Sequence, residues 1–172
     1  MVFPVMVLDS SFLVSFFRKS DVNNSRAIEM LKGHENSGLF LSDVILFETI
    51  SVLGVKDGTA DAKEAYDWIM DNSQIKIIYF NDTQRVEILQ EHLSKSGKMS
   101  VADISVLYLA RMTGAGVLAF DEAILDEHRT AWREEMQKAL KQEEKFDEWA
   151  VKTLRKSRKE EHAKQENEKE KK

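Results

Sequence analysis

The sequence has no cysteine and no long apolar run. The absence of cysteine excludes disulfides, thiolate metal sites and cysteine nucleophiles. No run approaches the ~20 apolar residues that a membrane-spanning helix needs. The apolar start of the chain is interrupted by Asp9 and lacks the basic flank and small-residue cleavage site of a signal peptide. We therefore expect a soluble, cytoplasmic protein that makes no use of a membrane.

Several motifs of common enzyme classes are also missing. The chain has no glycine-rich phosphate loop and no nucleophile elbow around a serine. Its four histidines are scattered without the spacing of metal ligands, so we expect each of them to be a surface or packing residue. Chemistry based on imidazole clusters or on an activated serine is therefore disfavoured.

Charge divides the chain into two parts. Residues 1–129 hold 12 Lys and Arg against 19 Asp and Glu, a net charge of −7, whereas residues 130–172 hold 13 against 11, a net charge of +2. Apolar residues make up 42% of the chain, which is enough for one core. We predict a globular domain over 1–129 and a charged extension over 130–172. That extension begins as an amphipathic helix with apolar positions Trp132, Met136, Ala139, Phe146 and Ala150, and ends in a solvated or disordered tail.

Short apolar runs alternate with helical patterns in the first part. The runs 5–8, 38–41, 75–80 and 117–120 are typical of buried strands. Helical spacing of apolar residues fills the intervals between them. The helix after Ser42 has apolar residues on most of its faces, including Phe47, so we expect it to be largely buried. Strands separated by helices indicate βαβ units, and hence an α/β fold with a mostly parallel sheet covered by helices.

Acidic residues recur where these elements meet. Asp9 and Asp121 each follow a predicted strand, at the edge where parallel sheets bind ligands. Both could instead be helix N-caps. Asp103 stands three residues after Ser100, the spacing of a capping box. Glu48 lies within an apolar helix, where a carboxylate is costly unless it is paired or binds a metal, and the nearest lysine, Lys56, is two turns away.

If these four acids converge, their mutual repulsion raises some of their pKa values. A hard divalent cation would relieve that repulsion. Mg²⁺ and Mn²⁺ prefer carboxylate and water oxygens, and the sequence offers no sulfur-based or imidazole-rich alternative. We therefore expect a magnesium or manganese site if the four acids converge.

The ordered set of segments resembles the PIN-domain nucleases, and among them small prokaryotic VapC-type toxins. The set consists of Leu8-Asp9-Ser10-Ser11, Ser42 with Glu48, Ser100-Val101-Ala102-Asp103, and Gly116 to Asp121. The resemblance implies a three-layer α/β/α sandwich and a Mg²⁺- or Mn²⁺-dependent ribonuclease. It also implies an RNA substrate, a homodimer and an antitoxin or other protein partner. The chain departs from the family pattern at Ala119, where Thr or Ser is common, and at Ile124, where an aromatic residue is common.

Carried over by position, the resemblance assigns roles to individual residues. Asp9, Asp103 and Asp121 would be the principal metal-side carboxylates, and Glu48 would ligate through water or orient the nucleophile. Ser10 would be the supporting hydroxyl beside the first acid, although an N-cap role explains it equally well. Lys95 and Lys98 flank the turn before Asp103 and would steady the RNA backbone; two ordinary loop lysines are the simpler alternative. The expected reaction is metal-assisted hydrolysis of an RNA phosphodiester, in a toxin-like or RNA-processing endonuclease.

Three other functions compete with this hypothesis. A binding or scaffold protein on the same fold would act through the extension, and would bind metal without turnover. A phosphohydrolase using Asp9 as nucleophile usually has a second acid two residues later, where this chain has Ser11. A phospho-acceptor receiver domain would need paired acids near the end of the first strand, and Asp9 has no acidic neighbour.

Overall fold

The computed structural model describes residues 5–95, 98–138, 141–142 and 145. The chain forms two compact units, Met1–His128 and Arg129–Lys172. The first contains every residue predicted for the site. Residues 122–138 are helical. Of the apolar positions expected in the extension, Ala139, Phe146 and Ala150 lie outside the described residues.

The centre of the first unit is a four-stranded sheet with the order β3-β2-β1-β4. Its strands are β1 (Val5–Leu8), β2 (Gly38–Ser42), β3 (Ile75–Ile78) and β4 (Gly116–Leu118). All three pairings are parallel. The four carboxyl ends therefore meet at one edge of the sheet, which we call the carboxyl edge.

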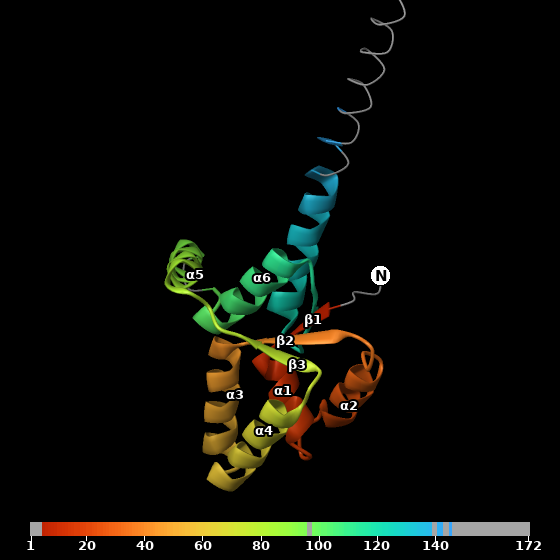
Figure 1. The fold of residues 1–172 in the computed structure, drawn as a ribbon, viewed down its shortest axis with the longest axis vertical. Coiled ribbons are helices and arrows are strands. Elements are labelled where there is room, and N and C mark those ends of the chain that lie inside the picture. The colour runs from red at the N-terminus through yellow and green to blue at the C-terminus, as the bar shows by residue number, and fades with distance from the viewer. Residues whose placement is uncertain (1–4, 96–97, 139–140, 143–144, 146–172) are drawn as a thin grey trace, which may run out of the picture. The chain divides into compact units, whose positions relative to one another are not determined.

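Helices cover both faces of this sheet, as Figure 1 shows. Helices α1 (Ser10–Phe17), α2 (Asn24–Lys32), α3 (Asp43–Lys56) and α4 (Thr59–Asp71) lie on one side. Helices α5 (Asp82–Ser94) and α6 (Val101–Thr113) lie on the other. The predicted α/β/α sandwich with a parallel sheet is therefore confirmed.

The core is built from the strands and the helix faces turned toward them. Met6, Val7 and Leu8 of β1 are buried, as the continuous apolar run predicts for a strand covered on both faces. The α6 residues Ala102, Val106 and Leu109 are also buried, at the i, i+4, i+7 spacing of one helix face. Ile104 and Leu107 are buried as well, so α6 is enclosed on more than one face. This packing fixes the ends of the strands and the helix N-termini that follow them.

Two expectations about the elements are wrong in detail. The helix α3 is not buried on most faces: the Phe47 side chain is 69% exposed and Val55 is 89% exposed. A helix lying on a sheet turns only part of its circumference toward the core, and α3 turns Ile45, Thr49 and Leu53 inward. Strand β4 ends at Leu118, three residues before Asp121 rather than directly at it.

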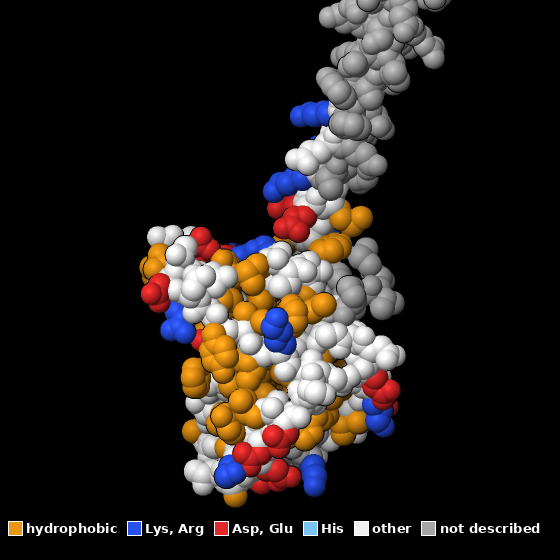
Figure 2. All heavy atoms as spheres, viewed as in Figure 1, with side chains coloured by type: hydrophobic (Ala, Val, Ile, Leu, Met, Phe, Trp, Pro, Cys, Tyr) orange, Lys and Arg blue, Asp and Glu red, His pale blue; other side chains and the backbone are white. Residues whose placement is uncertain are grey.

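Apolar side chains also reach the surface. Figure 2 shows them over a broad part of the face drawn, with charged side chains mostly toward its margins. Among the described residues, no helix combines the length and the hydrophobicity required to cross a membrane.

Candidate active site at the carboxyl edge

Asp9 is the buried acid at the end of the central strand β1. It is 1% exposed and is the N-cap of α1. Its Oδ2 atom accepts hydrogen bonds from the backbone N–H of Ser11 at 2.8 Å and from the Ser11 hydroxyl at 2.5 Å. Its Oδ1 atom is buried and has no hydrogen-bond partner among the residues that the structure describes. One carboxylate oxygen thus caps the helix, while the other makes no hydrogen bond within the described part of the chain.

Burial raises the pKa of Asp9 from 3.8 to about 6. Loss of hydration disfavours the charged carboxylate and is the largest cause. The hydrogen bonds from Ser11 oppose this effect, and the negative charge of Asp103 adds to the rise in pKa. The charges of these two predicted site residues thus interact, and burial remains the main cause of the raised pKa of Asp9.

The hydroxyl that supports Asp9 belongs to Ser11, whereas the sequence prediction named Ser10. Besides donating to Asp9, the Ser11 hydroxyl accepts a hydrogen bond from the Phe120 backbone N–H at 2.9 Å. It therefore ties the end of β1 to the segment that carries Asp121. One feature of the sequence indicates this contact: Ser11 stands two residues after the N-cap Asp9, and from that position a side chain can reach back to the capping carboxylate.

Asp103 and Asp121 also sit at helix starts. Asp103 and Ser100 form the capping box that their spacing predicts: the Asp103 carboxylate accepts from the Ser100 N–H at 2.6 Å, and the Ser100 hydroxyl accepts from the Asp103 N–H at 3.1 Å. Asp121 is exposed and accepts from the Ala123 N–H at 2.8 Å. The N-cap interpretation of Asp9 and Asp121 thus describes their local geometry, and Asp103 belongs to a capping box. These acids stand at three helix N-termini: Asp9 and Asp121 come after strands β1 and β4, whereas Asp103 comes after α5, in the first turn of the helix that leads into β4.

Glu48 is half-buried on α3, and its Oε2 atom is buried without a hydrogen bond to any described residue. No ion pair involves it in the described part of the chain, so the buried salt bridge considered as an alternative is not formed there. Within the same part, no three acidic or histidine side chains are close enough together to hold a metal ion. Asp9 and Glu48 therefore each have one buried oxygen that makes no hydrogen bond to a described residue, and the charge of Asp103 acts on Asp9.

A further acid at this edge escaped the sequence analysis. Asp43 follows β2 directly, and its side chain is 4% exposed. Its Oδ2 atom accepts a hydrogen bond from Nη2 of Arg85 on α5 at 2.8 Å. The sequence signal was an acid directly after a predicted strand and its N-cap, Ser42. Its arginine partner lies 42 residues further along the chain.

The two predicted lysines differ in their surroundings. Lys95 is half-buried, and its ammonium group is paired with Glu127. Lys98 is exposed. The Lys95 side chain therefore has a structural contact, joining the end of α5 to the helical segment that follows Asp121.

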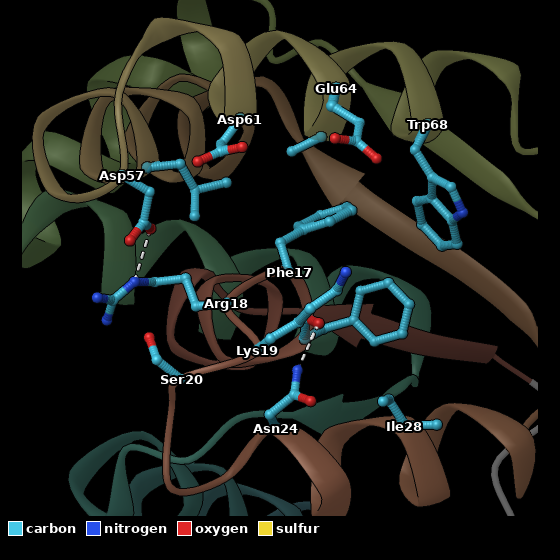
Figure 3. A pocket seen from close by; sticks show the side chains of 13 residues that line it. Phe17, Arg18, Lys19, Ser20, Asn24, Ile28, Asp57, Asp61, Glu64 and Trp68 are labelled. Atoms are coloured by element: carbon cyan, nitrogen blue, oxygen red, sulfur yellow. Dashed lines mark hydrogen bonds and ion pairs between the residues drawn. The ribbon is translucent and has the colours of Figure 1, made fainter.

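The structure also has a cavity of about 660 Å³ away from these acids. Figure 3 shows its side chains, which come from the end of α1, the start of α2, the end of α3 and from α4. The rings of Phe16, Phe17 and Trp68 lie close together, with centroids 5.1 to 5.4 Å apart. Asp61 and Glu64 of α4 face the cavity as well. None of the four predicted acids lines it. It is thus distinct from the carboxyl edge.

Comparison with known proteins identifies the family. The sequence model of the PIN domain matches residues 6–129. This chain belongs to the PIN domain family. The match covers nearly all of the first unit and confirms the resemblance drawn from the ordered acidic segments. No protein with a curated description is similar enough in sequence to count as a match.

Solved structures show the same PIN fold. VapC20 of Mycobacterium tuberculosis, described as a sarcin-ricin loop cleaving toxin, has a TM-score of 0.64 at 16% identity, covering 71% of this chain and 94% of its own. The structure of VapBC2 of Rickettsia felis bound to a DNA fragment from its promoter has a TM-score of 0.52 at 16% identity, covering 71% of this chain and 92% of its own. FitAcB of Neisseria gonorrhoeae has a TM-score of 0.51 at 14% identity, covering 69% and 89%. At these identities the likeness concerns the fold.

Proposed function

We propose that this PIN domain is a ribonuclease that hydrolyses RNA phosphodiester bonds with the help of a divalent cation, Mg²⁺ or Mn²⁺. The observation that carries the proposal is the Oδ1 atom of Asp9, which is buried at the carboxyl edge without a hydrogen-bond partner. A buried, unbonded carboxylate oxygen is costly, and a bound cation offsets that cost. Membership in the PIN domain family supports the choice of a nuclease over other uses of such a site.

The proposed donors are all carboxylate oxygens, which suit a hard cation by their chemistry. Asp9 and Glu48 each carry an unbonded buried oxygen, and the charges of Asp9 and Asp103 interact. Asp121 is the fourth acid of the proposed site. Carboxylate oxygens are the ligands that Mg²⁺ and Mn²⁺ prefer. When bound, such a cation supplies an activated water and stabilises charge on the scissile phosphate.

The protein's own residues have separable roles in this proposal. Asp9, Asp103 and Asp121 would hold the cation, and Glu48 would orient the attacking water or ligate through water. Ser11 keeps the Asp9 carboxylate in one orientation through its two hydrogen bonds. Ser10 remains a candidate for the supporting role that its position predicts. Exposed Lys98 is available to the RNA backbone, whereas Lys95 would first have to leave Glu127.

The test is cleavage of a random-sequence single-stranded RNA pool with Mn²⁺, Mg²⁺ or a chelator. We expect cleavage that requires the cation and is lost in Asp9→Asn and in Asp121→Asn. The matched control is Asp67→Asn, which removes an exposed carboxylate paired with Lys63 on α4. Full cation-dependent cleavage by both site variants would contradict the proposal. Cation binding without any cleavage would favour the alternative of a scaffold protein acting through residues 130–172.

A protein partner is the second part of the proposal. We infer an antitoxin-like partner and a cytoplasmic homodimer from the resemblance to VapC-type toxins. The cavity of Figure 3 is a suitable place for a partner side chain, because aromatic walls favour an apolar anchor and the carboxylates of Asp61 and Glu64 favour a neighbouring Lys or Arg. Trp68→Ala should weaken binding of the partner and leave RNA cleavage intact. Sedimentation of the full chain tests the dimer.

A further inference from the structure

Arg85 is held in one orientation at the carboxyl edge by two hydrogen bonds. Its Nε atom donates to the backbone carbonyl of Phe80 at 3.0 Å, and its Nη2 atom donates to Asp43 Oδ2 at 2.8 Å. A guanidinium has five N–H groups in a fixed fork, so these bonds leave three for a ligand. The side chain is nevertheless 57% exposed. It thus combines a fixed orientation with an open outer face.

The position of Arg85 follows from the strand order. Val7 of β1 pairs with Phe40 of β2, so two residues further along Asp9 is level with Ser42, the residue before Asp43. Ser42 in turn pairs with Ile78 of β3, and Phe80 follows two residues later. Neighbouring strands lie ~4.8 Å apart. The Arg85–Asp43 pair therefore lies at the same edge of the sheet as Asp9, with Asp43 following the strand next to that of Asp9.

The charge of Arg85 remains effective on its open side. Asp43 is buried behind the guanidinium and is the first residue of α3, where the helix N-terminus offsets part of its negative charge. Arginine is the side chain best suited to a phosphate, because its N–H groups match two phosphate oxygens. Two neighbouring cations are engaged in ion pairs, Lys95 with Glu127 and Arg111 with Glu91, whereas Lys98 is exposed.

We propose that Arg85, held by Asp43 and the Phe80 carbonyl, binds a phosphate of the RNA next to the one that is cleaved. The proposal rests on the ribonuclease function argued above and adds a residue to its substrate contacts. A domain with a net charge of −7 repels a polyanion, so a preset cation beside the acids gives the RNA backbone a defined place to bind. In this role Arg85 is a substrate-binding residue, and Asp43 positions it.

The experiment compares two double variants that each remove one ion pair. Arg85→Met with Asp43→Asn removes the proposed phosphate contact without leaving a buried charge unpaired. Arg111→Met with Glu91→Gln removes a similar ion pair between α5 and the last turn of α6. Because α6 starts at the carboxyl edge, its last turn lies away from the proposed site. Cleavage of the random-sequence RNA pool is followed with Mn²⁺ at several salt concentrations, together with thermal unfolding.

For the Arg85→Met/Asp43→Asn double variant we expect an apparent KM about tenfold higher than that of wild type, with kcat within about twofold. The reason is that the lost contact binds the substrate and the transition state equally. The slope of log KM against log salt should fall by about 0.7, the value for one phosphate contact on a single strand. The control double variant, Arg111→Met with Glu91→Gln, should match wild type in KM and in the salt slope. A purely structural Arg85 would change the unfolding temperature but neither KM nor the salt slope.

Two results would overturn the inference in distinguishable ways. If wild type cleaves the RNA and the Arg85 pair keeps the wild-type KM and salt slope, Arg85 serves only as the counter-charge of Asp43. If wild type cleaves no RNA, the ribonuclease function itself fails. Should the double variant not fold, Arg85→Lys keeps a charge beside Asp43 but loses the planar fork, and an unchanged KM in that variant would likewise overturn the inference.

Discussion

The hydroxyl of Ser11 donates to Asp9 Oδ2 at 2.5 Å and accepts from the Phe120 N–H at 2.9 Å. One small side chain thus orients the central acid and fixes the segment that leads to Asp121. Because the cap bonds use Oδ2, the unbonded Oδ1 is held in a constant position. The Asp9 carboxylate therefore has two roles in the proposal: its Oδ2 atom caps α1, and its Oδ1 atom belongs to the proposed cation site.

Ser11→Ala should lower the free energy of unfolding by about 1 to 2 kcal/mol, because it removes a bond to Asp9 and leaves the Phe120 N–H without its acceptor. Urea denaturation measures this change. The matched control is Ser10→Ala at the neighbouring position, which should cost less than about 0.5 kcal/mol. Equal costs for the two variants would contradict the role assigned to Ser11.

The contribution of Asp9 to the stability of the metal-free protein should fall as the pH rises from about 4 to about 7. The pKa of Asp9 is about 6 in the folded protein and 3.8 for an ordinary aspartate of the unfolded chain, so in this window the folded protein holds a proton that the unfolded chain has lost. The loss amounts to at most about 3 kcal/mol and is complete above the folded pKa. Denaturation curves of wild type and Asp9→Asn across this range measure it.

Asp9→Asn should therefore be more stable than wild type at pH 7.5 without metal, and equal to it near pH 4. Asparagine keeps an acceptor for the cap bonds from Ser11 and carries no charge to desolvate. The exposed control Asp67→Asn should follow wild type at both pH values. A difference between Asp9→Asn and wild type that does not change with pH would refute the assignment of the titration to Asp9.

Millimolar Mn²⁺ or Mg²⁺ should raise the unfolding temperature of wild type. A ligand that binds only the folded state stabilises it by mass action, by about 2.7 kcal/mol at a hundredfold excess over Kd. Asp9→Asn should abolish this rise and Asp67→Asn should retain it. Thermal unfolding followed by circular dichroism, with chelator-treated samples as reference, decides the outcome. A rise that survives Asp9→Asn would place the cation elsewhere.

Glu48→Gln should leave the metal-free stability unchanged or higher, since it neutralises a buried oxygen that has no partner. RNA cleavage should fall by about a hundredfold, the usual effect of losing a residue that orients a reacting water. Glu64→Gln, on the exposed surface of α4, is the control for both measurements. If Glu48→Gln were as active as wild type, Glu48 would not belong to the site.

Local patterns were enough to predict a mostly parallel sheet covered by helices, and the resemblance to the PIN-domain nucleases added the three-layer sandwich. Strands such as Val5–Leu8 are continuous apolar runs, and the cap at Ser100 shows in its spacing to Asp103, so nearest neighbours in the chain decide both. The right order of Asp9, Glu48, Asp103 and Asp121 along the chain was likewise sufficient for the family. Gathering three of them into one metal-binding group remains a prediction.

Only the tertiary structure decided which side chains meet across the chain. The choice of Ser11 over Ser10 depends on the direction in which α1 leaves β1, and on a backbone N–H 109 residues away. The pairing of Asp43 with Arg85 depends on β2 and β3 lying side by side. The exposure of Phe47 depends on which face α3 turns to its neighbours. Packing sets these relationships over distances that no local pattern spans, because a helix can rotate about its axis without any change in its own sequence.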